Sequence, residues 1–369
     1  FLGISNEPQQ MSCAITLTTI NLPYVVEDYI VNILKYEHSD VEFIITGDNK
    51  TPNGIENYLN NLSNKYNIKI HYLSINDQIK FLKEFPALNK YIPFNCIQRR
   101  NIGDLYALKN SYKKIIRIDD DNIPTNDDFI GFHNIVGTNL NGTVISSNNG
   151  WYNICDELID EDGIDFYPRG YLYEKRWEKT TTNKFNKKVK IVLNAGLWLG
   201  DPDIDAITRT NRNINAIKYK NSFKNNFVLD VDTWSPINTQ NTCYSSEIIP
   251  ASLVLPHVGR FDDIWGNYLL RKVIDVMGHY TSYGKPIVIQ ERNEHDLWKD
   301  LEQELNGYKF GKYFIDRINE IELKGKTYLD CYFELATNLD ALIEENKSIF
   351  SKVTSGMKIW ADTCSKIIN

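Results

Sequence analysis

Apolar and polar residues alternate along the first third of the chain in a pattern that predicts strands and helices in turn. Short runs of apolar, β-favouring residues predict strands at 14–19, 41–46, 68–73 and 115–118. Segments with apolar residues at helical spacing separate them and predict helices at 25–36, 55–65, 74–84 and 99–112, the third capped by Ser74. Such alternation is typical of a doubly wound α/β sheet.

The pattern is less regular beyond residue 121. Strands are predicted at 143–147 and 191–199, with a mixed, loop-rich stretch at 151–190 before the second, and an amphipathic period predicts a helix at 264–277. From residue 296 onward helices are predicted at 297–305, 313–323, 328–344 and 349–368. We therefore expect an α/β sheet followed by a helical C-terminal region.

The predicted strand at 115–118 runs directly into three carboxylates, Asp119, Asp120 and Asp121. A short apolar run is typical of an interior strand of a parallel sheet, and ligands bind such sheets at the carboxyl ends of the strands. Adjacent carboxylates repel one another, so a divalent cation is their natural partner and would also neutralise a diphosphate. Enzymes that use nucleotide-diphosphate sugars have an Asp-x-Asp motif of this form. The alternative is a solvated acidic turn, since Asn-Ile-Pro follows at once.

Composition narrows the classes of function. The chain has 369 residues, 42% of them hydrophobic, a net charge of -7 and no basic block, which argues against a nucleic-acid partner. No apolar run approaches the roughly 20 residues that span a bilayer. The six cysteines are too widely spaced for a zinc site or a disulfide framework, and reduced cysteines predict a cytoplasmic protein. Residues 1–11 lack the pattern of a secretory signal and are expected to be a tag remnant or a disordered N-terminus.

Polar residues near two other predicted elements are candidates for nucleotide contacts. Asp48 follows the second strand, where a carboxylate can accept hydrogen bonds from a ribose or a base, although an Asp-Asn turn is the plainer interpretation. Arg99, Asn101 and Asp104 lie at the start of a predicted helix, where donors suit a diphosphate or a base. Capping and ion pairing are the alternative there, with one of Arg99 and Arg100 in solvent.

A second group of candidates lies in the middle of the chain. Arg169 lies in a Tyr-Pro-Arg-Gly-Tyr string and Arg176 follows seven residues later. Two arginines beside a glycine and aromatic rings fit the recognition of phosphate and sugar hydroxyls. The alternative is a surface loop whose arginines pair with the acids at 156–165.

The most specific string spans residues 194–206. Its candidates are Asn194, Gly196, Trp198, Asp203 and Asp205. Glycine permits close backbone approach, and a tryptophan can pack against a sugar face, although a buried tryptophan is more usual. The two acids could orient hydroxyls or close a turn.

Two acids, Asp262 and Asp263, begin the predicted helix at 264–277. Helix capping explains them, since aspartate is favoured there. In a sugar enzyme the same position supplies the carboxylate that meets an acceptor or the anomeric centre.

Together these strings resemble the reversibly glycosylated polypeptides, the plant family that contains UDP-arabinopyranose mutase. The matching strings, in the same order, are the acids at 119–121, Tyr-Pro-Arg-Gly-Tyr at 167–171 with Arg176, Gly-Leu-Trp-Leu at 196–199 with Asp203, Asp205 and Ala206, Arg-Phe-Asp-Asp-Ile-Trp at 260–265, and Gly-Lys-Pro at 284–286. The resemblance implies a glycosyltransferase-A-like fold, a doubly wound mixed sheet, as a nucleotide-sugar domain over residues 12–290. The helical C-terminal region would then occupy residues 291–369.

The resemblance also implies a chemistry and its residues. It implies UDP-sugar binding, a divalent cation (manganese, with magnesium as the alternative) held by Asp119 and Asp121, and ring contraction between pyranose and furanose forms. The arginine that becomes reversibly glycosylated in that family falls on Arg169, although a guanidinium is a poor nucleophile and could instead clamp the diphosphate. Asp262 or Asp263 would stabilise charge at the anomeric carbon or move a proton. Nucleotide-sugar contacts are expected from Asp48, Arg99, Asn101, Asp104, Asp119, Asp120, Arg176, Asn194, Gly196, Trp198, Asp203 and Asp205.

Three functions stay open at this point. The first is a metal-dependent UDP-sugar pyranose/furanose mutase. The second is a metal-dependent glycosyltransferase that transfers a sugar to a cell-surface glycan, with Asp263 as the base. The third is a non-catalytic nucleotide-sugar-binding partner protein, because Gln290 stands where the family has a histidine and leaves the last metal ligand open. The C-terminal helices could form a homo-oligomer interface or cap the sheet.

Overall fold

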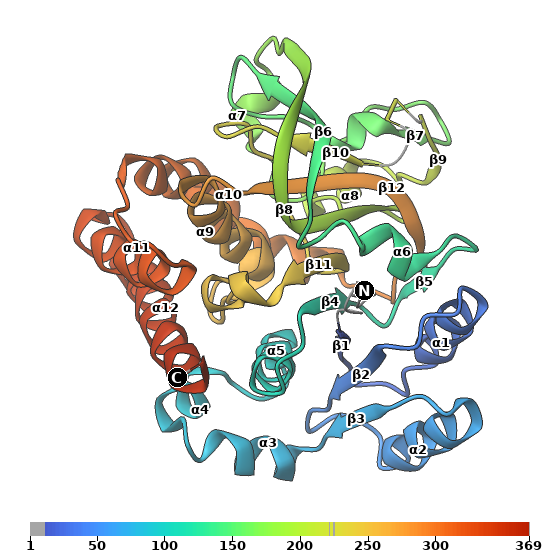
Figure 1. Ribbon diagram of the computed structural model, residues 1–369. Helices are drawn as coiled ribbons and strands as arrows, with labels where there is room; N and C mark the ends of the chain where they lie inside the picture. The colour runs from blue at the N-terminus through green and yellow to red at the C-terminus, as the bar shows by residue number, and fades with distance from the viewer. Residues whose placement is uncertain (1–11, 221, 224–225, 369) are drawn as a thin grey trace, which may run out of the picture.

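One mixed sheet of twelve strands organises the molecule (Figure 1). The computed structural model describes residues 12–220, 222–223 and 226–368, so the expectation for residues 1–11 lies outside the described residues. The strands are β1 (Cys13–Thr18), β2 (Val41–Thr46), β3 (Ile70–Leu73), β4 (Lys114–Ile118), β5 (Asn122–Pro124), β6 (Asn139–Ser147), β7 (Leu158–Asp160), β8 (Thr182–Gly200), β9 (Ala216–Tyr219), β10 (Asn226–Leu229), β11 (Asn241–Ser245) and β12 (Tyr280–Gln290).

Helices cover the sheet and fill the C-terminal end of the chain. The α-helices are α1 (Val25–Lys35), α2 (Ile55–Tyr66), α3 (Ile75–Leu82), α4 (Pro86–Tyr91), α5 (Arg100–Lys109), α6 (Phe129–His133), α7 (Tyr173–Arg176), α8 (Ala206–Asn211), α9 (Asp262–Val276), α10 (Leu297–Glu320), α11 (Tyr328–Leu342) and α12 (Lys347–Ile368). Short 3-10 helices are η1 (Ile97–Arg99), η2 (Ile154–Glu157), η3 (Ser246–Ala251) and η4 (Gly259–Phe261).

The N-terminal part of the sheet is parallel and doubly wound. Strands β3, β2, β1 and β4 lie side by side in that order and run in one direction. Figure 1 shows α1 on one side of these strands and α5 on the other. The strand β4 is buried along its whole length, as its run of isoleucines requires. The predicted architecture, an α/β doubly wound mixed sheet followed by C-terminal helices, is confirmed.

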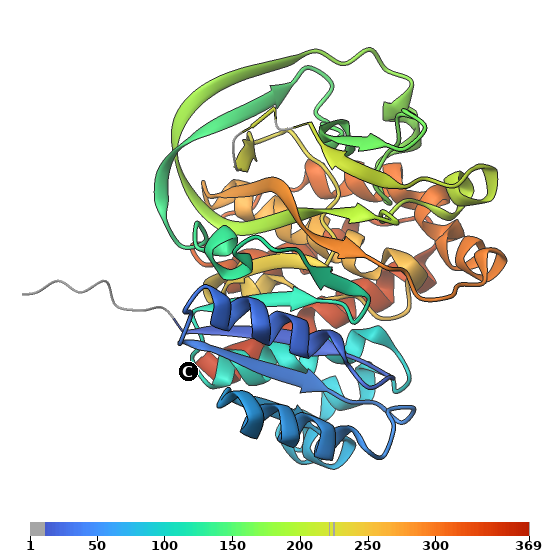
Figure 2. The ribbon, with the colours of Figure 1, turned by 90° about the vertical axis from the view of Figure 1, so that its right-hand side faces the viewer.

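The rest of the sheet brings distant parts of the chain to one edge. β11 runs antiparallel to both β4 and β8, and β12 runs parallel to β8, so β1, β4, β8 and β12 share one direction. Their carboxyl ends therefore meet at the same edge of the sheet, where ligands bind in folds of this kind. Figure 2 shows β6 and the long, curved β8 as a ribbon beyond the core.

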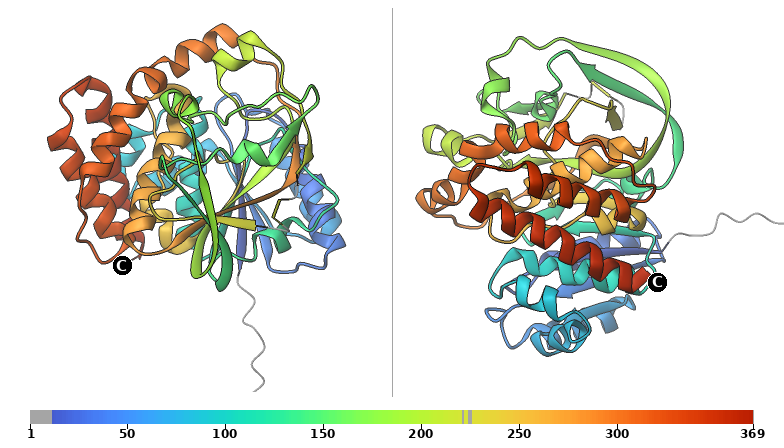
Figure 3. Two further views of the ribbon diagram at one scale, coloured as in Figure 1. Left: turned by 90° about the horizontal axis from the view of Figure 1, so that it is seen from above. Right: turned by 90° about the vertical axis from the view of Figure 1, so that its left-hand side faces the viewer.

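The C-terminal helices form a layer on one flank of the sheet, as Figure 3 shows. The ring of Trp265 on α9 stacks on Phe350 of α12 with centroids 5.6 Å apart, and Trp360 of α12 donates to the Ile249 carbonyl. Both tryptophans are fully buried. These helices belong to the hydrophobic core, which is consistent with the predicted role of capping the sheet.

Several elements differ from the predictions. The stretch at 151–190, expected to be loop-rich, contains the first half of β8, whose exposed positions 182–188 carry no apolar alternation that could announce a strand. The two helices predicted at 297–305 and 313–323 are one continuous helix, α10, which passes through Gly307 and Gly311. The sequence analysis did not predict the short helices α4, α6, α7 and α8 or the strands β5, β7, β9, β10, β11 and β12. The cap at Ser74 is confirmed, because its hydroxyl accepts from the amide of Asp77.

Candidate active site

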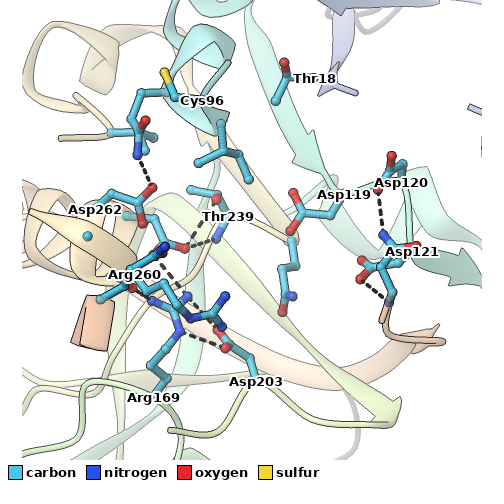
Figure 4. Close-up of a pocket in the computed structure, with 18 of the residues that line it drawn as sticks. Thr18, Cys96, Asp119, Asp120, Asp121, Arg169, Asp203, Thr239, Arg260 and Asp262 are labelled. Atoms are coloured by element: carbon cyan, nitrogen blue, oxygen red, sulfur yellow. Dashed lines mark hydrogen bonds and ion pairs between the residues drawn. The ribbon is translucent and has the colours of Figure 1, made fainter. Parts of the chain in front are cut away.

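A cavity of about 530 Å³ opens at the edge where β1, β4, β8 and β12 end. Figure 4 shows Asp119, Asp120 and Asp121 on one side of it, and Arg169, Asp203 and Asp262 on the other. Seven residues proposed from the sequence line this cavity: Asp119, Asp120, Asp121, Arg169, Asp203, Asp262 and Asp263. The sheet therefore brings together residues from four separate stretches of the chain.

The three acids after β4 have different partners. Asp119 accepts a hydrogen bond from buried Arg100. Asp120 accepts from the Thr19 hydroxyl at 2.7 Å, and Asp121 accepts from the Asn122 amide at 2.9 Å. Burial raises the pKa of Asp119 to about 6, although Arg100 opposes the shift. Burial also raises the pKa of Asp121, with Asp120 adding to it. Three carboxyl groups therefore lie together at this end of the cavity, and one of them, Asp119, is paired with an arginine.

Arg169 lies on the opposite side and is held from several directions. Its Nε and Nη2 donate to the two carboxylate oxygens of Asp203 at 2.8 and 3.0 Å, and Nη2 also donates to Asp263 at 3.2 Å. Its Nη1 donates to the Arg260 carbonyl. Burial favours the neutral form of Asp203, but the charge and hydrogen bonds of Arg169 outweigh it and hold the pKa of Asp203 well below its usual range. The guanidinium is therefore fixed in position, with most of its donors already engaged.

The paired acids at the start of α9 face different surroundings. Asp263 accepts from Arg169 and from the backbone and hydroxyl of Thr239. Asp262 accepts a 2.6 Å hydrogen bond from the Gln98 amide. Burial and the neighbouring Asp263 raise the pKa of Asp262 to about 7, with Arg169 opposing the shift. Asp262 is therefore the carboxyl on this side of the cavity that can exchange a proton near neutral pH.

Two arginines that line the cavity were not selected from the sequence as site residues. Arg260 at η4 is paired with Glu304 at 3.0 Å and with Asp300 at 3.4 Å, both on α10. Arg292 follows the end of β12 and also lines the cavity. The available sequence signal for Arg292 was its place just after the apolar run at 287–289, two residues beyond Gln290.

The candidates near α5 lie outside the cavity lining. Asp48 accepts from the backbone of Cys96, which itself lines the cavity. Arg99 donates to Gln78, Asn101 bonds both backbone groups of Val254, and Asp104 pairs with Arg117 at 2.9 Å. Arg99 and Arg100 are both buried, so the expectation that one of them is solvated is wrong. These four candidates bond to segments next to the cavity and do not line it themselves. Their contact with a ligand stays a prediction.

The remaining candidates also have partners within the protein. Arg176 donates to Asp205 at 2.8 Å and packs over the Tyr173 ring, while Asp205 caps α8. The structure therefore places Arg176 away from the main cavity, although the sequence predicted that it faces the diphosphate-sugar.

Asn194 is buried within the sheet and accepts from Ser282. Gly196 and Trp198 line a small space behind Arg169 and Asp203.

The acid end offers oxygen ligands for a cation. Within the described residues, no three His, Cys, Asp or Glu side chains converge as a metal-binding group. However, Asp119, Asp121 and Gln290 all line the cavity, and the buried Gln290 Oε1 has no hydrogen-bond donor. Two carboxylates and an amide oxygen form an all-oxygen set, which suits Mg²⁺ or Mn²⁺. These residues therefore fit a hard divalent cation.

The fold and this cavity define an α/β protein with a ligand site at the carboxyl ends of its strands. A family model described as reversibly glycosylated polypeptide matches residues 64–368. The chain belongs to that family, as its motifs predicted.

Comparisons with known proteins give more distant likenesses. UDP-arabinopyranose mutase 1 of Arabidopsis thaliana is 22% identical over 270 residues, which cover 69% of this chain and 70% of that protein. A rice protein (Oryza sativa subsp. japonica) named "Probable inactive UDP-arabinopyranose mutase 2" is 24% identical over 284 residues, 73% of this chain and 76% of that protein. A crystal structure of glucosyl-3-phosphoglycerate synthase from Mycobacterium tuberculosis, with Mn²⁺, UDP and product, matches at a TM-score of 0.42 and 11% identity over 82% of this chain and 80% of that chain.

No helix in the described ranges has the length and apolar character needed to cross a membrane.

Proposed function

We propose that this protein is a metal-dependent nucleotide-sugar enzyme that interconverts the pyranose and furanose forms of a UDP-sugar. Family membership and the names of the curated relatives support an enzyme of this class. The observation that carries the proposal is the arrangement of the cavity. An acid end that fits a cation faces a fixed guanidinium, Arg169, and a carboxyl with a pKa near neutrality, Asp262.

The acid end is assigned to the cation and the diphosphate. Asp119 and Asp121, with the amide oxygen of Gln290, would hold the cation. When bound, the cation would neutralise negative charge on the departing diphosphate. Asp120 is held by Thr19 and Asn21, so we assign it to the positioning of the loop that carries the two ligands.

Arg169 is assigned to the sugar side of the cavity. A guanidinium is always charged, and Asp203, Asp263 and the Arg260 carbonyl engage its donors. Few N–H groups remain, so Arg169 is poorly suited to clamp a diphosphate through two parallel hydrogen bonds. Its fixed charge can instead orient a sugar hydroxyl or interact with negative charge on the substrate.

Asp262 is assigned to proton transfer. Interconversion of ring forms changes which hydroxyl oxygen closes onto the anomeric carbon, so one hydroxyl must lose a proton and another must gain one. A carboxyl with a pKa of about 7 can do both near neutral pH. Asp263 bonds Arg169 and Thr239, so it positions these groups, and the sequence-based assignment of the base to Asp263 is replaced by Asp262.

Two alternatives remain. The same cavity serves a glycosyltransferase if Asp262 deprotonates an acceptor hydroxyl, and the pKa of Asp262 favours that role equally. A non-catalytic partner protein is the other alternative. It is supported by the rice relative, whose name describes it as probably inactive.

The test is incubation of the purified protein with Mn²⁺ and a panel of UDP-sugars without any acceptor, followed by chromatography of the products. Conversion of one sugar nucleotide into an isomer supports the mutase. Turnover only in the presence of a glycan acceptor would replace it with the transferase. Binding of UDP without any turnover would favour the non-catalytic partner.

A further inference from the structure

Arg292 is an arginine of the cavity whose side chain has no hydrogen-bond acceptor among the described residues. It lines the cavity, and its buried Nε has no hydrogen-bond partner. Among the described residues, Arg292 forms no hydrogen bond or ion pair, whereas Arg169 and Arg260 each pair with two carboxylates. A buried polar group without a partner is costly, so a guanidinium in this state indicates a missing acceptor.

The backbone around Arg292 is attached directly to the acid triplet. The amide of Glu291 donates to the Asp121 carbonyl at 2.9 Å, and the amide of Asn293 donates to the Asp121 carboxylate at 3.4 Å. The Asn293 side chain reaches Asp120 at 3.3 Å. Arg292 lies between these two anchored residues, so its position is tied to that of the proposed cation site.

Arg292 shares the cavity with the Arg169 side as well as with the acid triplet. Arg169, Asp203 and Arg260 line the same cavity. Carboxylates already balance the charges of Arg169 and Arg260, because each of these arginines pairs with two acids. Among the described residues of this lining, Arg292 is therefore the arginine whose charge stays available to a ligand.

Charge balance indicates which ligand Arg292 takes. Three carboxylates and the paired Arg100 give the acid end a net charge of about -2, which a divalent cation would cancel. A bound diphosphate would add about two further negative charges, and part of that charge would still need a counter-charge beyond the cation. Arg292 offers that counter-charge, with five N–H donors in a fork that matches a phosphate.

We propose that Arg292 binds the sugar-bearing phosphate of a nucleoside diphosphate through its free guanidinium. This inference rests on the proposed function, because it takes the diphosphate to lie between the cation site and Arg169. It also replaces Arg169 with Arg292 as the diphosphate clamp.

The test is calorimetric titration of wild-type, Arg292→Gln and Arg292→Lys protein with UDP, UMP and inorganic pyrophosphate, each with Mn²⁺ present. Glutamine keeps a planar polar group without charge, and lysine keeps the charge without the fork. Arg212→Gln is the matched control, because Arg212 is exposed and makes the same change in net charge. Thermal melting without ligand checks that each variant is folded.

We expect Arg292→Gln to weaken UDP binding by about tenfold or more, and UMP binding by less than about threefold, because UMP lacks the second phosphate. Arg292→Lys should lie between wild type and Arg292→Gln. If Arg292→Gln fails to fold, the folded Arg292→Lys variant carries the same comparison.

Several outcomes would overturn the inference. UDP affinity that changes no more in Arg292→Gln than in Arg212→Gln would contradict it and leave the proposed function standing. Equal losses for UDP and UMP would contradict the assignment to the sugar-bearing phosphate. A different result would separate the two proposals. If wild-type protein binds pyrophosphate through Arg292 but binds no uridine nucleotide, Arg292 still binds a diphosphate group, and the proposed function is refuted.

Discussion

At the scale of single residues, Arg169 shows how a charged side chain can be buried and still line a cavity. Asp203 meets its guanidinium with two parallel hydrogen bonds, and Asp263 adds a third. Bidentate pairs of this kind fix orientation as well as charge. These contacts therefore fix the orientation of the Arg169 guanidinium on the side of the cavity opposite the acid triplet.

The first prediction concerns Arg169→Lys. Lysine keeps the charge beside Asp203 and Asp263 but cannot reproduce the planar fork. We expect turnover to fall by about tenfold to a hundredfold, the scale of one lost charged hydrogen bond, while the fold persists. Steady-state kinetics measures the first, and far-UV circular dichroism with thermal melting measures the second. Normal turnover by folded Arg169→Lys protein would show that the assignment of Arg169 is wrong.

The second prediction concerns the pH dependence of Asp262. Its pKa in the folded protein is raised from 3.8 to about 7 by burial and by Asp263. The contribution of Asp262 to stability is therefore full below about pH 4 and is lost as pH rises through about 7. We expect the unfolding free energy of Asp262→Asn protein to fall less across this window than that of wild type. Parallel pH profiles for the two proteins would contradict the assignment.

Some of the residues that line the cavity could be predicted from the sequence, and others could not. The acids after β4 and Arg169 could be predicted because each lies in a distinctive local string. Arg292 has no such string, and it stands out only because its buried Nε has no hydrogen-bond partner among the described residues. The pKa of Asp262 likewise depends on burial and on residues distant in sequence, which no local pattern reports.

At the scale of elements, α10 supports the cavity from outside. Its Glu304 and Asp300 hold Arg260, and the Arg260 carbonyl accepts from Arg169. The helix can approach η4 closely because it has a glycine, Gly307, against the ring of Phe261. The helix α10 therefore supports the site indirectly: its acids hold Arg260, and Arg260 in turn holds Arg169.

The third prediction uses two glycines of α10. A Cβ at Gly307 would lie 2.1 Å from the Phe261 ring, whereas a Cβ at Gly311 would meet Leu172 at an ordinary 3.5 Å. We expect Gly307→Ala to destabilise the protein by about 1–3 kcal/mol through overpacking. Gly311→Ala, the matched control, should be neutral or should stabilise by up to about 1 kcal/mol through helix propensity. Denaturant unfolding measures both, and equal effects would refute the packing argument.

The elements that the sequence misjudged have physical causes. Residues 182–188 of β8 are exposed and paired with β6, so backbone hydrogen bonds form the strand without a buried face. Gly307 and Gly311 resemble a helix break in sequence but serve close packing in the structure. Local propensity yields to tertiary contacts in both places.

At the scale of the whole molecule, the sheet collects the site from four strand ends. The order of strands and helices could be predicted for the parallel half, because each strand there is a compact apolar run. The antiparallel placement of β11 between β4 and β8 could not, since it depends on contacts between segments more than forty residues apart. That placement aligns the ends of β4 and β8.

The fourth prediction concerns ligand binding by the assembled site. Asp121→Asn removes one carboxylate from the oxygen set that fits a cation. We expect it to weaken metal-dependent UDP binding by about 1–3 kcal/mol, the scale for loss of a charged partner. Titration with UDP in the presence of Mn²⁺, and again with EDTA, measures the metal-dependent part. Unchanged metal-dependent affinity would rule out Asp121 as a ligand.

The most direct test of the central claim measures the equilibrium between the two ring forms of a UDP-sugar without any acceptor, starting from each form in turn. Purified wild-type protein with Mn²⁺ is given a UDP-pentopyranose in one sample and the matching UDP-pentofuranose in another, and both are followed by NMR. The account predicts that both samples reach the same mixture of ring forms and that Arg169→Lys protein approaches it far more slowly. Stable starting material in both samples, under conditions in which the protein binds UDP, would contradict the assignment of mutase activity.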